Sequence, residues 1–451
     1  MNNNEMNNNE MTTGKPLPVI LKFALPMLLG NIFQQFYNLV DTIVVGRFIG
    51  EDALAAVGTT GTAIFLMTAL INGFCRGTEI VLSQYYGIGK KEDFKKTVIA
   101  LANIVILMTI VITALGNLLI PAFVKLLRIP IEIQAGSILY MRINFTLIIG
   151  VILYNATTAI LRSIGDSRTP LIALIVATIT NIILDLYFVI VLGFGVAGVA
   201  YATIIAQFLS AATCIFVIIR RRKELNLTEL DFKPDMLKII LIIRTGIPMT
   251  LQSTLITLGS MSVQSLVNTF GTATMAAYAA VIKIDSVTIQ VVVSLSTALS
   301  VFTGQNIGTR NYDRIRTALY QTLSVILPAC FAIAALVLIF KEQLLSLFLD
   351  PATAAESIEI GSTYLTIIGI AYLIAGIMNS YLGVIRGSGD VNVSTMAGLF
   401  ELGARIVFAH ILVRHLGITG IWIATPISWA FGCSIAILRY YSGKWQSKAF
   451  V

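Results

Sequence analysis

Charged side chains are scarce in this sequence. Only 12% of its 451 residues are Asp, Glu, Lys or Arg, whereas 57% are hydrophobic, and the mean hydropathy is +0.86. Soluble globular chains carry about 25% charged residues, which keep their surface in water. The scarcity excludes a water-soluble globular protein and indicates a chain whose solvent is the lipid bilayer.

Residue types that commonly act as catalysts or metal ligands are also few. The chain has two histidines, His410 and His415, and four cysteines that all lie in apolar runs, where cysteine acts as a small core residue. It has no HExxH and no Walker A motif. The glycines of Gly193–Gly198 are not followed, about 20 residues later, by the acid that a dinucleotide site requires. We therefore expect neither an enzyme nor a bound cofactor.

Long apolar runs, by contrast, are abundant. Twelve of them approach or exceed the roughly 20 residues that cross a bilayer as a helix. They cover Leu17–Val45, Ala53–Cys75, Thr97–Ile120, Ala135–Ile160, Thr169–Leu192, Val196–Ile219, Ile239–Val267, Met275–Val301, Thr317–Phe340, Ile360–Val384, Asn392–Val413 and Ile418–Leu438. The predicted fold class is an all-α polytopic membrane protein with twelve transmembrane helices.

Basic residues outnumber acidic ones, which gives a net charge of +8. With both termini placed in the cytoplasm, 22 of the 31 basic residues fall in or beside cytoplasmic segments and 5 on the opposite side. Such an excess is typical of cytoplasmic loops, so the charge reflects topology and does not indicate a nucleic-acid partner. We expect a multi-pass protein of the cell (inner) membrane with both termini cytoplasmic.

The two halves of the chain resemble each other. Phe23-Ala-Leu-Pro-Met matches Thr245-Gly-Ile-Pro-Met, and Arg162-Ser-Ile-Gly-Asp matches Arg386-Gly-Ser-Gly-Asp, at offsets of about 220 residues. Because six is an even number, two six-helix repeats have the same orientation in the membrane. The repeat predicts two pseudo-two-fold-related lobes around an axis along the membrane normal.

These patterns divide the chain into five parts. Residues 1–14 begin with a polar, Asn-rich duplication and are expected to form a disordered tail. Residues 15–219 form the N-lobe with helices 1–6, and residues 220–238 are a basic cytoplasmic linker. Residues 239–441 form the C-lobe with helices 7–12, and residues 442–451 are a cytoplasmic tail.

Polar residues inside the N-lobe spans are candidates for function, since ionisable groups in the hydrocarbon are costly. One face of the first span carries Asn31, Gln34, Asn38 and Asp41. The fifth span adds Asn181 and Asp185, one turn apart, and the sixth adds Thr203. Such oxygen ligands suit Na⁺, and two neighbouring carboxylates also suit a proton because their like charges repel. The alternative is a structural hydrogen-bond network that ties the three spans together.

The C-lobe carries a different set of charges. Glu401 and Arg405 are one helical turn apart and can pair, and the alternative is a role with substrate or proton. Lys283 and Asp285 are two residues apart, so they do not face each other and need other partners. In the N-lobe, Glu79 is interpreted as a local pair with Arg76 near the inner end of the second span.

Taken together, these features resemble the MATE family, the multidrug and toxic compound extrusion transporters. The resemblance covers the chain from about Lys15 to Lys444. It rests on the helix from Pro26 to Asp41, the Asp41-x-x-x-x-Gly46-Arg47-x-x-Gly50 stretch, the Leu161-Arg162-x-x-Gly165-Asp166 loop with its copy at Arg386, and the Asn181, Asp185 and Thr203 set.

The resemblance implies two six-helix lobes in a V and export of organic, cationic or amphiphilic compounds by alternating access, in exchange for H⁺ or Na⁺. It implies a cation site made of Asp41, Asn181, Asp185 and Thr203, where Na⁺ could bind. It also implies a substrate pocket at Gln34, Tyr37, Asn38 and Tyr140. Some members carry a glutamate on helix 7, which this sequence lacks. The expected partners are small organic substrates and the bilayer, and the expected functional state is a monomer.

Two other functions remain open. A lipid or polysaccharide-precursor flippase of the same superfamily tends to have extra helices or a strongly cationic cavity, and beyond the helix ends this sequence places only Lys283 and Arg405 inside the membrane. The membrane subunit of an ATP-driven pump is opposed by the full internal repeat and the carboxylates within one lobe.

Overall fold

The computed structural model of the protein describes residues 11–228 and 233–450. Within these ranges the chain folds into helices and has no β-strand. The helices are α1 (Pro16–Val44), η1 (Val45–Ile49), α2 (Glu51–Gly87), α3 (Lys91–Leu126), α4 (Ile131–Thr146), α5 (Ile149–Ser163), α6 (Arg168–Leu186), η2 (Tyr187–Val191), α7 (Gly195–Arg220), α8 (Met236–Val267), η3 (Asn268–Phe270), α9 (Thr272–Thr288), α10 (Gln290–Ile307), α11 (Tyr312–Ile339), α12 (Lys341–Ser346), α13 (Ala355–Gly387), α14 (Val391–Leu416), α15 (Ile418–Tyr441) and η4 (Lys444–Ser447).

The helices are long enough for a membrane protein. Among the described residues, 11 helices are long and apolar enough to cross a bilayer, and a bent pair, α4 with α5, brings the number to 12. Helices satisfy every backbone polar group within the segment, which the hydrocarbon requires. The all-α polytopic fold is therefore confirmed, and the twelve predicted spans each correspond to one helix or helix pair.

One predicted span is sharply bent. The span expected at Ala135–Ile160 consists of α4 and α5, which meet at an angle of 45°. No proline lies at the break, and α3 supplies hydrogen-bond partners for the end of α4. The Thr113 hydroxyl donates to the carbonyl oxygen of Phe145 at 3.1 Å, and the Asn117 amide donates to the Thr146 hydroxyl at 3.2 Å. The periodicity of the sequence within α4 and α5 cannot reveal these contacts, because they come from another helix.

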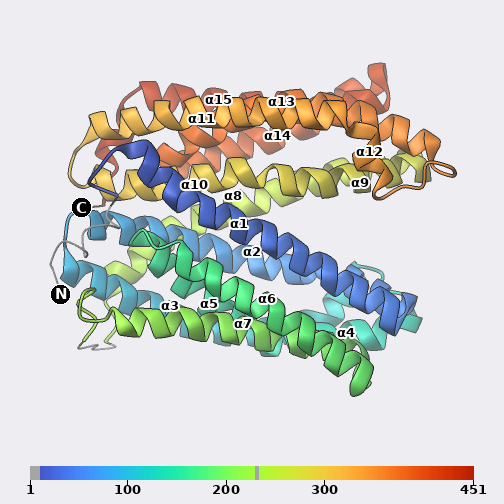
Figure 1. Ribbon diagram of the computed structural model, residues 1–451, viewed down its shortest axis with the longest axis horizontal. Coiled ribbons are helices and arrows are strands. Elements are labelled where there is room, and N and C mark those ends of the chain that lie inside the picture. Colours follow the sequence, from blue (N-terminus) through green and yellow to red (C-terminus); the bar gives the residue numbers. More distant parts are fainter. Residues whose placement is uncertain (1–10, 229–232, 451) are drawn as a thin grey trace. The chain divides into compact units, whose positions relative to one another are not determined.

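The chain forms two compact units, which are described separately. Unit 1 comprises Pro26–Thr250. In it, α7 packs against α4, α5 and α6, and α2 packs against α3, α4 and α5 (Figure 1). The result is a six-span bundle whose polar faces can enclose a cavity.

Unit 2 comprises Met11–Leu25 and Leu251–Val451. Its central helix is α13, which packs against α9, α10, α11 and α15, while α14 packs against α15 (Figure 1). Glycine allows close approach of α13 to α10: a Cβ at Gly383 would lie 2.7 Å from the carbonyl oxygen of Ser296 on α10. Small residues serve the same purpose in membrane helix packing generally.

The boundaries of the two compact units differ from those of the two sequence halves, and the differences occur at or near two prolines. The first residues of α1, up to Leu25, belong to unit 2, and α8 up to Thr250 belongs to unit 1. The divisions fall at Pro26 and two residues after Pro248, both of which lie inside helices. Proline removes a backbone hydrogen bond and permits a helix to bend there.

Both segments expected to be tails contribute packed residues. Residues 1–10 lie outside the described residues, but Met11 is only 1% exposed, and Gln305 of α10 accepts a hydrogen bond from its backbone amide. The Arg314 guanidinium donates to three backbone carbonyl groups of residues 11–14. At the other end, Trp445 is 1% exposed and its indole donates to the Tyr440 carbonyl. Residues 11–14 and the described part of the C-terminal segment are thus ordered parts of unit 2.

Candidate functional site

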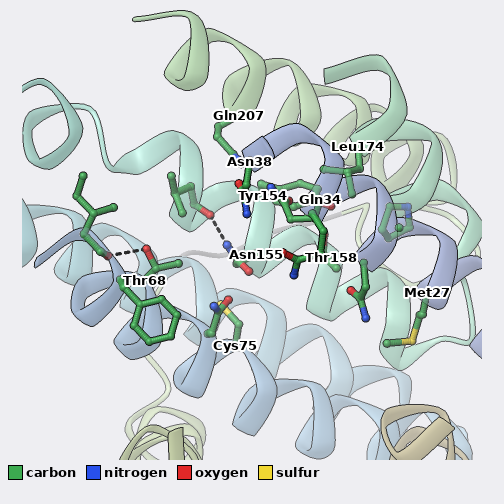
Figure 2. A pocket seen from close by; sticks show the side chains of 18 of the residues that line it. Met27, Gln34, Asn38, Thr68, Cys75, Tyr154, Asn155, Thr158, Leu174 and Gln207 are labelled. Atoms are coloured by element: carbon green, nitrogen blue, oxygen red, sulfur yellow. Dashed lines mark hydrogen bonds between the residues drawn. The ribbon is translucent and has the colours of Figure 1, made fainter. Parts of the chain in front are cut away.

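Unit 1 encloses a cavity of about 740 Å³. Faces of α1, α2, α4, α5, α6 and α7 form its wall. Figure 2 shows Gln34 and Asn38 of α1 and Asn155 and Thr158 of α5 around it. Asp41 also lines the cavity. The polar stripe of the first span therefore faces this space, as the spacing of three or four residues between its members predicts.

Asp41 also belongs to a buried polar cluster behind the cavity wall. Asn181 and Asp185 of α6 are each 0% exposed and do not line the cavity. Asn181 is assigned the amide orientation in which its nitrogen faces the carboxylates, because the other orientation would set oxygen against oxygen. That nitrogen donates to Asp41 Oδ1 at 2.9 Å and to Asp185 Oδ2 at 3.3 Å. Thr203 of α7 donates to Asp41 Oδ2 at 3.5 Å.

The four residues predicted to form a cation site thus lie together. Both carboxylates share one amide donor, so they lie within the distance of about 8 Å over which charges couple strongly in a protein. One oxygen, Asp185 Oδ1, is buried and has no hydrogen-bond partner among the described residues. An unpartnered buried carboxylate oxygen is costly, and a proton or a cation would satisfy it.

Three of the four predicted substrate-pocket residues line the cavity, and the fourth does not. Gln34 and Asn38 line the cavity, and so does Tyr140 of α4, which is 8% exposed. Tyr37 is buried instead of lining the cavity, yet it and Tyr140 both lie within electrostatic reach of Asp41 and Asp185. Both tyrosine side chains therefore lie near the two carboxylates.

A pair of π-helical turns follows the two carboxylates. The turn η1 begins four residues after Asp41 and η2 begins two residues after Asp185. The two turns contact each other, and their residues Val45 and Val189 share an apolar cluster with Val199 of α7. A π turn widens a helix locally and is frequent at functional sites. The sequence did not predict these turns, because nothing in a periodicity of 3.6 residues marks them.

The charged residues Arg76 and Glu79 of α2 are not arranged as the sequence predicted. Glu79 is 5% exposed and, with Arg76, lines the cavity wall. Within the described residues neither forms an ion pair within 4.0 Å, so the interpretation as a local pair is wrong. Arg162 of α5 lines the same cavity, and sequence reasoning had not assigned it to a site. The spacing of a charge near a helix end does not reveal whether it faces a cavity or the lipid headgroups.

The secondary candidates lie in unit 2. Glu401 and Arg405 of α14 form an ion pair of 2.6 Å, and each is 8% exposed. Arg405 also donates to the Ser428 hydroxyl at 3.3 Å. Asp285 of α9 accepts a hydrogen bond from the Tyr372 hydroxyl at 2.9 Å, whereas Lys283 is exposed. Glu401 and Arg405 thus form the ion pair that their spacing of one helical turn allows.

Removing one partner of this pair should destabilise the protein. Arg405→Gln leaves the buried Glu401 carboxylate without its counterion, and we expect a loss of about 3 kcal/mol of unfolding free energy. The double variant Glu401→Gln, Arg405→Gln should recover most of that loss, because both charges are then gone. Thermal unfolding in detergent measures the effect, with the exposed Lys283→Gln as control. Equal melting temperatures for Arg405→Gln and the wild type would contradict a stabilising pair.

Comparison with known proteins places this arrangement in a family. The MatE family model matches residues 26–187 and 248–411. The "Probable multidrug resistance protein YoeA" of Bacillus subtilis (strain 168) is 31% identical over 94% of this chain and 93% of its own. Two solved structures share the fold. A MOP superfamily transporter from Pyrococcus furiosus Vc1 has a TM-score of 0.89 at 23% identity, covering 98% of this chain and 99% of its own. A multidrug resistance MATE family transporter in an outward-facing conformation has a TM-score of 0.88 at 24% identity, covering 98% and 99%.

The family model covers both halves at their repeated segments, and the relative from Bacillus matches nearly end to end. Members of this family are membrane transporters and not enzymes, and they require no cofactor. The chain described here belongs to the MATE family of multidrug efflux transporters.

Proposed function

We propose that the protein is a secondary antiporter of the cell membrane, with both termini in the cytoplasm, which exports organic cations or amphiphiles in exchange for H⁺ or Na⁺. The observation that carries this proposal is the double position of Asp41. Its carboxylate lines the cavity and is also held by Asn181 and Thr203 of the buried cluster. An ion bound in the cluster therefore changes the charge that a substrate meets in the cavity.

Competition for the negative charge of Asp41 would couple binding of the substrate to binding of the coupling ion. A cationic compound in the cavity is attracted to an ionised Asp41, whereas a proton or Na⁺ in the cluster neutralises it. Binding of one weakens binding of the other, and by linkage the effect is reciprocal. Exchange follows when the two sides of the membrane present the cavity with different concentrations of the coupling ion.

The arrangement accommodates the two coupling ions differently. A proton can bind to Asp41 or Asp185 without any rearrangement, and it would relieve the repulsion of the two carboxylates. Na⁺ prefers oxygen ligands, and the Asn181 amide presents nitrogen to the carboxylates. A Na⁺ ion bound by all four residues would require this amide to turn. With the assigned amide orientation the cluster supports a proton site directly, and a Na⁺ site requires Asn181 to present its oxygen instead.

Alternating access requires the two halves to move. We propose that residues 15–219 and 239–441 act as the moving lobes, connected by residues 220–238, and that one chain is the functional unit. The prolines Pro26 and Pro248 inside α1 and α8 are places where those helices can bend as the lobes move.

Proteoliposomes with separately imposed gradients test this function. The purified chain is reconstituted without ATP, and movement of a cationic dye is followed under an inward proton gradient, an inward Na⁺ gradient or neither. We expect dye transport with at least one gradient and none without. Transport that requires ATP, or that proceeds equally without any gradient, would contradict the proposal. The two gradient arms identify the coupling ion.

A further inference from the structure

The cavity of unit 1 has a basic end that the proposed antiport does not use. Arg76 and Glu79 on α2 and Arg162 on α5 all line it. Glu79 interacts electrostatically with both arginines, and together the three groups carry one excess positive charge. The sequence had counted only Lys283 and Arg405 as bases inside the membrane, and the structure adds Arg76 and Arg162 as bases that line the cavity.

The donors of these arginines are not used up by the protein. Neither guanidinium forms a hydrogen bond or an ion pair within the part of the chain that the structure describes, and Arg162 Nε is buried with no partner there. Asp166, one turn after Arg162, is engaged elsewhere: it accepts from the amide and hydroxyl of Thr169 and lies 3.6 Å from Arg221. A buried guanidinium donor without a partner is costly, which a ligand with acceptor oxygens would offset.

The internal repeat lacks charged counterparts of Arg76 and Glu79, whereas Arg162 has one in Arg386. The counterparts of Arg76 and Glu79 in the second half, at offsets of about 221 to 224 residues, fall between Thr297 and Thr303, where no charged residue occurs. Unit 2 builds the corresponding helix, α10, from buried Ala298, Val301 and similar side chains. The same scaffold thus exists without counterparts of Arg76 and Glu79, so the presence of these two charges in unit 1 calls for a role other than folding.

The basic end lies far from the carboxylates. Val57 of α2 and Val40 of α1 both pack against the apolar cluster that follows Asp41, and Arg76 is 19 residues further along α2 than Val57. At 1.5 Å per residue this is about 28 Å. A small organic molecule cannot bridge that distance, so the basic end contacts substrates independently of Asp41. Figure 2 shows Cys75 of α2 and Thr158 of α5, the neighbours of this end, facing the same cavity.

We propose that Arg76 and Arg162 form an oxyanion-binding subsite of the cavity, which binds a carboxylate or phosphate group, with Glu79 limiting its affinity. Guanidinium groups match these oxyanions in charge and geometry. The subsite extends the substrate class to compounds that carry an acid group. It rests on the proposed export through this cavity.

Binding of a matched dye pair tests the subsite. The probes are a rhodamine with a free carboxylate and its methyl ester, which differ in one charge. Affinity is measured by fluorescence polarisation with the purified full chain in a non-ionic detergent. We expect Arg162→Gln and Arg76→Gln each to weaken binding of the acid about tenfold and to leave the ester unchanged. Glu79→Gln should strengthen binding of the acid.

Controls separate charge from folding. Arg162→Lys keeps the charge and should retain most of the affinity for the acid, and unchanged binding of the ester reports that a variant is folded. Arg220→Gln removes an exposed charge at the end of α7, outside the cavity wall, and should change neither affinity. Loss of acid and ester binding together, or an equal effect of Arg220→Gln, would overturn the proposal.

Competition with the acid dye distinguishes a free solute from a lipid headgroup as the source of the oxyanion. Inorganic phosphate and a short-chain phosphatidylglycerol are titrated against the acid dye in wild type and Arg162→Gln. Displacement by phosphate that depends on Arg162 indicates a site for solutes, and displacement by the lipid alone indicates a headgroup site. Both results support the subsite, whereas no displacement that depends on Arg162 overturns it. Failure of the antiport would appear separately, as absent transport of the ester in proteoliposomes.

Discussion

Replacing Asp41 by Asn is expected to reduce gradient-driven export to the level of liposomes without protein. Asparagine keeps the size of the side chain. Its oxygen can still accept from Asn181 and its amide nitrogen can donate to the Thr203 hydroxyl, but it cannot bind a proton or carry the charge. The cavity would then lose the one carboxylate that connects it to the buried cluster. Because ionisable groups inside a membrane are otherwise costly, the loss of coupling should be accompanied by unchanged or greater stability.

The measurement is dye transport in proteoliposomes that contain equal amounts of each protein. Asp285→Asn is the matched control, because that carboxylate lies in unit 2 and accepts a hydrogen bond from Tyr372. We expect it to retain most of the transport. Full transport by a well-inserted Asp41→Asn protein would remove Asp41 from the mechanism. Complete loss in Asp285→Asn alone would move the coupling site to unit 2.

The second large effect is expected for Asp185. We expect Asp185→Asn to abolish coupled export as well, and the double variant Asp41→Asn, Asp185→Asn to be no worse than either single variant. Residues that act as one unit are strongly non-additive, and a double-mutant cycle measures this. The physical reason is the shared Asn181 donor, which places both carboxylates in one cluster.

Proton binding gives an independent readout of the same cycle. Calorimetric titration of the purified protein with a cationic substrate, in buffers of different ionisation enthalpy, reports the protons released on binding. We expect wild-type protein to release protons if H⁺ is the coupling ion, and the double variant to release none. If the coupling ion is Na⁺, substrate should instead displace Na⁺ in the wild type alone. Equal displacement in wild type and double variant would place the switch outside this cluster.

The sequence predicted some parts of the site and missed others for definite reasons. The helical spacing of Asn38 with Asp41, and of Asn181 with Asp185, indicated which side chains share a face, and the structure brings these faces together. Arg162 was quoted only as part of a loop motif, because its spacing does not show that its side chain lines the cavity. The interpretation of Arg76 and Glu79 as a local pair was wrong, because two neighbouring residues on one helix can both face a cavity without forming an ion pair with each other.

The sequence by itself determined the solvent of this protein, its helices and the doubling of its fold, because hydrophobic run length and repeated motifs are properties of the chain alone. Only the tertiary structure decided where α4 breaks from α5, at a place where Thr113 and Asn117 of another helix form hydrogen bonds with the end of α4. It also decided that the basic residues of α2 and α5 line the same cavity as Asp41. The physical reason is that a helix specifies the face on which a side chain lies, whereas the packing of neighbouring helices specifies what that face meets.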